Sequence, residues 1–169
     1  QPFLHGDNMD KKKLFAPTAE FGHFSEITPE FLKQNGIKGL LCDIDDTLVT
    51  HNYPLPTKEV EKWANDLKNA GILLCFVSNN YYKRVKPFAE KLNVPFFCMS
   101  GKPSERNYKK AVAALDLKKE ETAMLGDQLF TDIKGANLFG ITSYKVNPIG
   151  EKATLWIKIK RKRERKIAE

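Results

Sequence analysis

Two acidic residues placed two positions apart follow the first strongly apolar stretch of the chain. Asp43 and Asp45 stand in the run DIDDT directly after GLLC, where a buried strand would give way to a loop. Carboxylates held this close repel each other unless a cation or a shared proton compensates them. Mg2+ suits such a pair, because it takes oxygen ligands and shares them with phosphate. One aspartate could attack phosphorus while the other exchanges the proton, although an isolated pair is equally typical of a turn with a helix cap.

Three later segments carry further groups for the same chemistry. Ser78 and Asn79 follow the apolar run ILLCFV, so a hydroxyl and backbone N–H groups could hold phosphate oxygens where a helix begins. Lys102, in GKPSERNYKKA, could neutralise charge on the phosphate and on the nucleophile. Asp127, in MLGDQLFTD, is a third metal-ligand candidate, and Gly126 allows a close approach. Each segment alone is also typical of an ordinary loop or surface, and their order along the chain favours phosphoryl transfer.

Short apolar runs alternate with stretches of helical periodicity along most of the chain. Strands are predicted at residues 40–44, 72–78, 95–99, 122–126 and 142–146. Helices are predicted at residues 28–36, 57–70, 82–92, 103–115 and 131–139. This alternation predicts an α/β fold: a doubly wound, Rossmann-like sheet of five parallel strands with helices on both faces.

Sheets of this kind bind ligands beyond the carboxyl ends of their strands, at a reversal of strand order. Asp43, Ser78 and Asp127 all fall at or near such ends, so we expect them to share one site. Asp132 stands at the start of the last predicted helix, where it could either support this site or cap the helix.

The ordered set DIDDT, Ser78, Lys102 and GDQLFTD resembles the motifs of the haloacid dehalogenase-like superfamily of phosphotransferases, over roughly residues 25–150. The resemblance implies that Asp43 is the nucleophile, that Asp45 is the general acid and base, and that Lys102 assists catalysis. It also implies a Mg2+ ion held by Asp43, by the backbone carbonyl of Asp45 and by Asp127. The residues implied to contact the phosphoryl group are Thr47, which would also buttress the motif loop, Ser78, Asn79 and Lys102.

Enzymes of this superfamily usually carry a cap domain at one of two insertion points, and neither point has room for one here. The 34 residues between Asp43 and Ser78 are used by the expected loop, helix and strand. The 23 residues between Ser78 and Lys102 are used by another helix and strand. We therefore expect a capless domain whose open site admits a large or surface-bound substrate, or is closed by a neighbouring subunit of a homo-oligomer.

A narrower resemblance is carried by ITPEFLKQNGIKGLLCDIDDTLV, FVSNN, KP and LGDQLFTDIKGAN. These segments are similar to the bacterial YqeG-type proteins, which are related to mitochondrial phosphatidylglycerophosphate phosphatases. The resemblance implies a Mg2+-dependent phosphomonoester hydrolase with phosphatidylglycerophosphate as the best single substrate, and a soluble phosphomonoester as the alternative. Asp46 departs from the pattern, because relatives usually have asparagine there, and this extra carboxylate could alter metal affinity.

Length and composition fit one domain with a basic end. The chain has 169 residues, of which 41% are apolar and 29% charged, and no apolar run approaches the length that spans a bilayer. We expect residues 1–8 to be the remnant of an expression vector ahead of Met9, residues 9–151 to form the phosphatase domain, and residues 152–169 to form a basic tail or helix. Cys42, Cys75 and Cys98 lie in apolar runs, which favours reduced thiols and a cytoplasmic location.

The basic tail allows three interpretations. Residues 152–169 contain eight Lys or Arg against two Glu, so they hold +6 of the net charge of +7. With apolar neighbours such as Trp156, they could attach the protein peripherally to the anionic inner surface of a membrane. They could contact RNA or the ribosome, or form a solvated final helix with Trp156 packed on the domain. A non-enzymatic binding protein that works through this tail is the alternative function, although it would not need intact acid, metal and lysine positions.

Overall fold

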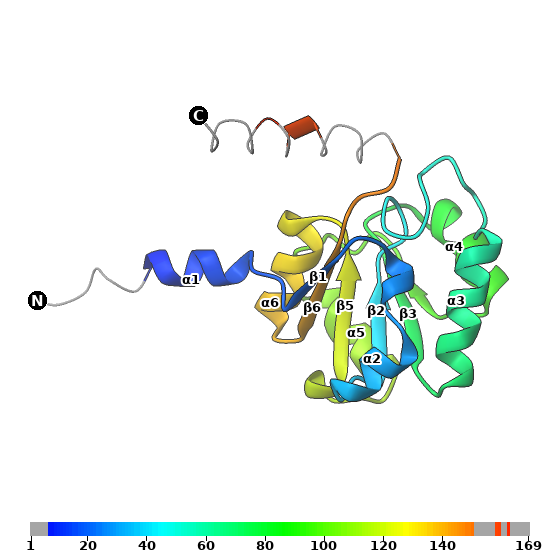
Figure 1. Ribbon diagram of the computed structural model, residues 1–169, viewed down its shortest axis with the longest axis horizontal. Coiled ribbons are helices and arrows are strands. Elements are labelled where there is room, and N and C mark those ends of the chain that lie inside the picture. The colour runs from blue at the N-terminus through cyan, green and yellow to red at the C-terminus, as the bar shows by residue number, and fades with distance from the viewer. Residues whose placement is uncertain (1–6, 151–157, 160–161, 163–169) are drawn as a thin grey trace, which may run out of the picture.

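A parallel sheet of six strands forms the middle layer of the molecule, with helices on both of its faces (Figure 1). The computed structural model describes residues 7–150, 158–159 and 162. The strands lie in the order β1-β6-β5-β2-β3-β4, and all neighbours are parallel. Their bounds are β1 Ala19–Phe21, β2 Gly39–Cys42, β3 Leu73–Val77, β4 Phe96–Phe97, β5 Thr122–Gly126 and β6 Thr142–Val146. The predicted doubly wound α/β fold is confirmed.

The order of the strands reverses between β2 and β5. From β2 the chain proceeds outward to β3 and β4, and it then returns to place β5 on the other side of β2. Cys42 near the end of β2 is level with Leu125 near the end of β5, so the two strands end side by side. A crevice forms at such a reversal, because the following loops leave in opposite directions. The residues that come after β2 and β5 therefore meet at this crevice.

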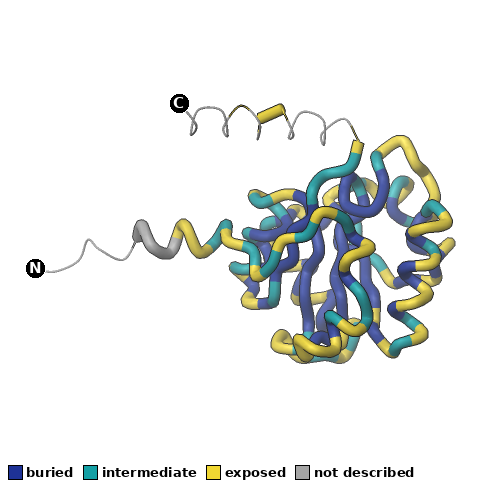
Figure 2. Tube along the Cα trace, in the orientation of Figure 1, coloured by how far each residue is buried: buried dark blue, intermediate teal, exposed yellow. Residues whose placement is uncertain are grey.

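Two apolar layers enclose the sheet, and successive residues of β2 serve one layer each. Leu40 packs in the layer that contains the inner faces of α2, α3 and α4, whereas Leu41 packs in the layer under α5 and α6. The central strands β2 and β5 are accordingly buried along their whole length, and most exposed positions lie on the outer helices and loops (Figure 2). The helix bounds are α1 Asp7–Leu14, α2 Pro29–Gln34, α3 Lys58–Asn69, α4 Tyr82–Leu92, α5 Arg106–Ala114 and α6 Lys134–Phe139.

Several boundaries differ from those predicted. The sheet has a sixth strand, β1, which pairs with β6 and is too short to show a strand pattern in sequence. Helix α5 begins at Arg106, because Pro103 belongs to the turn that follows Lys102. The predicted helix at 131–139 is divided into a π-helical segment, η3 (Leu129–Ile133), and α6. The predicted strand at 95–99 is reduced to the two residues of β4.

Two of the predicted segments fall largely outside the described residues. Of residues 1–8, the predicted vector remnant, the structure describes residues 7–8, which belong to α1. Of the basic tail, residues 152–169, it describes residues 158–159 and 162. Within the described part of the chain, no helix is long and apolar enough to cross a bilayer. Cys42 and Cys75 are buried free thiols, and Cys98 is a half-buried one.

Candidate active site

A pocket of about 320 Å³ opens at the carboxyl edge of the sheet, where the strand order reverses. Its walls are formed by the segments that follow β2, β3, β4 and β5. The lining residues are Asp43, Asp45, Asp46, Ser78, Asn79, Asn80, Tyr81, Lys102, Gln128, Thr131 and Asp132. Every one of these side chains carries a polar group, which suits a phosphate better than an apolar ligand.

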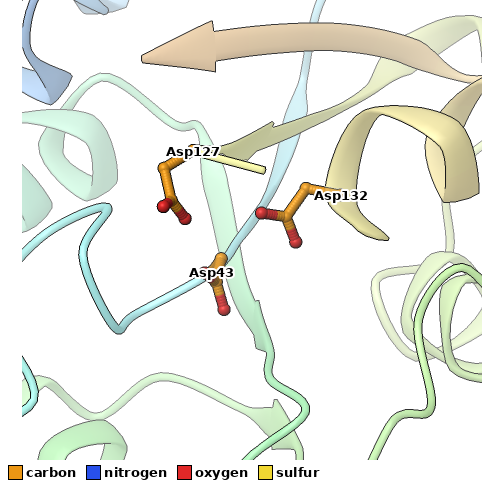
Figure 3. Close-up of side chains that lie close together, drawn as sticks. All are labelled: Asp43, Asp127 and Asp132. Atoms are coloured by element: carbon orange, nitrogen blue, oxygen red, sulfur yellow. The ribbon is translucent and has the colours of Figure 1, made fainter. Parts of the chain in front are cut away.

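Three aspartates converge at this edge (Figure 3). Asp43 directly follows β2, Asp127 directly follows β5, and Asp132 lies in η3. Each offers a carboxylate oxygen within 4.8 Å of the other two, and all three residues are buried. The hydroxyl of Thr47 connects two of them, because its Oγ1 is 3.1 Å from Asp127 Oδ1 and 3.4 Å from Asp43 Oδ2. The two acids predicted from separate motifs therefore meet, and a third one joins them.

Asp132 is fixed by its own turn and by a glycine opposite. Its Oδ2 accepts the backbone N–H of Gln128 at 3.2 Å, and its Oδ1 accepts from Lys102 Nζ at 2.6 Å. A Cβ atom at Gly126 would overlap the Asp132 carboxyl group, so a glycine at the end of β5 is what admits this close approach. Of the two roles that the sequence left open, the contact with Lys102 joins Asp132 to the site, whereas no side-chain hydrogen bond caps the following helix α6.

Lys102 lies between two of the acids. Its Nζ is 3.0 Å from Asp43 Oδ1 and 2.6 Å from Asp132 Oδ1, and it donates to the Val77 carbonyl at 2.7 Å. Burial would lower the pKa of Lys102, but the Asp132 and Asp43 carboxylates outweigh it and raise that pKa above its usual value. An ammonium group has three donors. Lys102 is therefore a cation whose three donors are all engaged by protein groups.

The pKa of Asp43 is raised from 3.8 to about 8. Burial is the largest cause; Lys102 opposes it, and repulsion from Asp132 and Asp127 adds to it. A divalent cation beside these oxygens would act in the opposite direction, because nearby positive charge favours the ionised carboxyl group. In donor type and in charge, the acidic cluster therefore fits a hard cation of the Mg2+ kind.

Two residues predicted to bind phosphate hold protein groups instead. The Asn79 side-chain amide accepts the Lys102 N–H at 2.7 Å and donates to the Lys102 carbonyl at 3.2 Å, so it fastens the segment that carries the lysine. Thr47 does not line the pocket, is fully buried, and directs its hydroxyl to the acids. Both side chains thus position protein groups, and Asn79 also lines the pocket. Ser78 lines the pocket as well, and its Oγ accepts the Asn80 N–H at 3.1 Å.

Asp45 lines the pocket and is held by Arg84 of α4 and by Asn80, which precedes that helix. Arg84 donates from Nε and Nη2 to Asp45 Oδ1 at 3.1 and 2.8 Å, and Asn80 Nδ2 donates to Oδ2 at 2.9 Å. Sequence reasoning missed both partners. A signal for Arg84 was nevertheless present: the first turn of α4 holds Lys83 and Arg84 and no acid, an unfavourable placement next to the positive end of a helix dipole.

No cap domain covers the pocket within the described residues 44–101. The chain between Asp43 and Ser78 forms a loop, α3 and β3, and the chain between Ser78 and Lys102 forms α4 and β4. Both predicted insertion points are therefore occupied by elements of the sheet and its helices, and these described residues hold no inserted cap.

Comparison with known proteins identifies the family. A model of the haloacid dehalogenase-like hydrolase family matches residues 52–140. Probable phosphatase YqeG of Bacillus subtilis (strain 168) is 37% identical over 156 residues, which are 92% of this chain and 91% of that protein. The chain belongs to the haloacid dehalogenase-like hydrolases. The family predicted from the motifs is confirmed, and so is the prediction of a phosphatase-type enzyme.

Solved structures resemble this hydrolase in fold. A protein from Listeria monocytogenes serotype 4b has a TM-score of 0.53 at 16% identity, over 74% of this chain and 99% of that one. A protein from Xanthomonas campestris has a TM-score of 0.54 at 11% identity, over 75% of this chain and 72% of that one. At such low identity these two structures show a shared fold and carry no information on substrate.

Proposed function

We propose that this hydrolase cleaves phosphomonoesters in a Mg2+-dependent reaction that passes through an aspartyl phosphate on Asp43. One observation carries the proposal: Asp43 lines an open polar pocket, with Lys102 Nζ 3.0 Å from one oxygen and two more aspartates close by. A carboxylate so surrounded can attack phosphorus, and a fixed cation beside it balances the charge of the incoming phosphate.

The reaction consists of two displacements at phosphorus. In the first, an Asp43 oxygen bonds to phosphorus, the bond to the substrate oxygen breaks, and protonated Asp45 gives its proton to that leaving oxygen. In the second, water attacks the phosphorus of the acyl phosphate and loses a proton to Asp45, which releases inorganic phosphate and restores Asp43. Asp45 lines the same pocket as Asp43, which supports its role as the group that transfers this proton.

The proposed cation is held by the carboxylates of Asp43 and Asp127 and by the backbone carbonyl of Asp45. Asp132 lies beside this set, but its oxygens already accept from Lys102 and from the Gln128 N–H. When bound, the cation offsets the repulsion among the acids and the phosphate and keeps Asp43 ionised. Lys102, Ser78 and the backbone N–H groups around it bind and orient the phosphoryl oxygens.

We propose phosphatidylglycerophosphate as the substrate, with a soluble phosphomonoester as the second candidate. The open pocket supports a substrate whose larger part stays outside the protein, because no cap encloses the site within the described residues 44–101. The similarity to the protein named Probable phosphatase YqeG supports a phosphate ester in general.

The proposal is tested with 4-nitrophenyl phosphate, with Mg2+ or with chelator, and with wild type and Asp43→Asn. The substituted amide keeps the shape of the side chain but cannot form the acyl phosphate, so turnover falls roughly a thousandfold, about 4 kcal/mol in the barrier. Trapping of phosphate on wild type but not on the variant gives an independent measurement. Equal turnover by the two proteins would exclude the aspartyl-phosphate mechanism.

The substrate requires a second comparison. Phosphatidylglycerophosphate in mixed micelles and a panel of soluble phosphomonoesters are given to the same enzyme at matched concentrations. A kcat/KM at least about tenfold higher for the lipid supports the first candidate, because contacts beyond the phosphate lower the barrier. A higher value for a soluble ester replaces it with the second candidate.

A further inference from the structure

The exposed large apolar side chains of the described residues gather at one edge of the molecule. Nine such side chains are exposed, and six of them lie in segments that follow strands at the carboxyl edge of the sheet. We call these six the rim: Tyr53, Leu55, Tyr81, Tyr82, Met99 and Phe130, with exposed fractions between 46% and 73%. Scattered exposed apolar residues are common, but a group on one side of a protein marks a surface that contacts something else.

The rim surrounds the mouth of the candidate active site. Tyr81 lines the pocket itself, and Phe130 directly precedes Thr131, which also lines it. The Met99 N–H donates to the Asn80 carbonyl at 2.8 Å, so Met99 is anchored to another lining residue. The loop of Tyr53 and Leu55 approaches α4 through the Pro54 carbonyl, which accepts from Arg84 at 3.5 Å. A polar pocket is thus bordered by apolar side chains contributed by four separate segments.

Positive charge lies along the same edge. Lys83 is exposed beside Tyr82, and Lys134 lies 5.5 Å from the ring of Phe15, which itself packs edge-on against Phe130. The basic segment of residues 152–169 has a net charge of +6. In sequence it follows the stretch around Ile149, which is attached to the pocket. That stretch is held there because the Ile149 N–H donates to the carbonyl of the pocket residue Asp46 at 2.9 Å.

We propose that the rim docks on the surface of an anionic lipid bilayer, so that the mouth of the pocket faces the head groups. Tyrosine and other amphipathic rings are favoured at the boundary between head groups and hydrocarbon, and adjacent Lys and Arg add attraction to anionic lipids. A second copy of the chain fits less well, because face-to-face pairing would bring Lys83 and Lys134 of one copy toward the same lysines of the other. This inference rests on the proposed function: docking is useful to an enzyme with a lipid phosphate as substrate, because the phosphate can then enter the pocket while the lipid stays in the bilayer.

The test compares two double variants of the full chain. Leu55→Ser with Phe130→Ser removes two rim side chains that are 46% and 73% exposed. Leu73→Ser with Leu138→Ser removes two apolar side chains, each 43% exposed, that lie away from the carboxyl edge, and serves as the matched control. Wild type and both variants are floated with phosphatidylcholine vesicles that contain or lack phosphatidylglycerol. Turnover of 4-nitrophenyl phosphate, thermal midpoints and solution mass are measured on the same samples.

Wild type and control are expected to float with the anionic vesicles, and the partition of the rim variant to fall about tenfold or more. Equal flotation of wild type and rim variant would overturn the proposal. The proposal would also be overturned if wild type did not float and instead formed a dimer that the rim variant abolished. That result would identify a second copy of the chain as the occupant of the rim. Rim-dependent flotation without any turnover of the soluble ester would leave docking intact and reject the proposed function instead.

Discussion

Two lysine–carboxylate pairs join neighbouring segments at opposite ends of the sheet. At the amino edge, Lys38 Nζ is 2.8 Å from Glu121 Oε1, and the two side chains are 64% and 26% exposed. At the carboxyl edge, Lys102 Nζ is 2.6 Å from Asp132 Oδ1, and the side chains are 2% and 1% exposed. The distances are nearly the same, so burial is what separates the two pairs.

The difference shows which end of the sheet is built for chemistry. A solvent-exposed pair is screened by water and contributes little to stability. A buried pair requires that both charges leave water, a cost that their attraction barely offsets. The carboxyl edge adds two more buried aspartates to its pair, and burial together with repulsion from Asp132 and Asp127 raises the pKa of Asp43 although Lys102 opposes the rise. Such a concentration of buried charge is expected where a site must bind ions, and not where a fold merely needs support.

The largest effect is expected for Lys102→Met. The variant leaves Asp43 and Asp132 buried without their cation, which costs about 3 kcal/mol in the free energy of unfolding. Turnover of 4-nitrophenyl phosphate falls roughly a thousandfold, because no fixed charge balances the incoming phosphate. Urea unfolding and steady-state kinetics measure the two quantities. If the variant is as stable or as active as wild type, the buried pair is dispensable. The difference in burial between the two pairs would then have no consequence for the protein.

The next effect concerns Asp43→Asn and the pH dependence of stability in chelator. Because the folded protein raises the Asp43 pKa from 3.8 to about 8, it binds this proton more tightly than the unfolded chain does. Asp43 therefore lowers stability progressively as pH rises from about 4 to about 8. The variant lacks this loss, so the difference in the free energy of unfolding between variant and wild type should grow in favour of the variant across the window. A difference between the two proteins that stays constant with pH would contradict the assignment.

A smaller effect is expected for Arg84→Leu. Of the two described partners of the Asp45 carboxylate, Arg84 and Asn80, the variant keeps Asn80. If Asp45 transfers the proton, its looser position should lower turnover of an alkyl phosphate about tenfold. An aryl phosphate should lose less, because its leaving group needs little protonation. Lys86→Leu is the control, since Lys86 pairs with Glu90 on the exposed side of the same helix. Equal losses for both substrates would indicate a structural role for Arg84.

The smallest effect is expected at the amino edge. Lys38→Met removes one charge of the pair with Glu121, and because both side chains of the wild-type pair are accessible to water, its loss changes stability little. The pKa of Glu121, which its hydrogen bond with Lys38 lowers, should rise in the variant. Turnover should stay at the wild-type rate and the thermal midpoint should shift within error. A loss comparable to that of Lys102→Met would remove the distinction between the two edges.

Much of the site could be predicted from sequence, because strand ends and motif residues are local features. The apolar runs before Asp43 and Asp127 place both residues at carboxyl ends of strands, and the structure brings them together. The partners of these residues were harder to predict. Arg84 reaches Asp45 across 39 positions, and Lys102 reaches Asp43 across 59. Such pairings depend on strand order and on side-chain direction, which a linear pattern does not contain.

The sequence by itself determined the alternation of strands and helices, the family and the order of the chemical groups. Periodicity and turn residues act over a few neighbours, so they are legible in one dimension. The tertiary structure alone decided that Asn79 and Thr47 contact protein groups, that Asp132 meets Lys102, and that six apolar side chains border the pocket. These outcomes arise because packing brings distant segments within hydrogen-bond range, so the partner of a side chain is set by its neighbours in space and not by its neighbours in sequence.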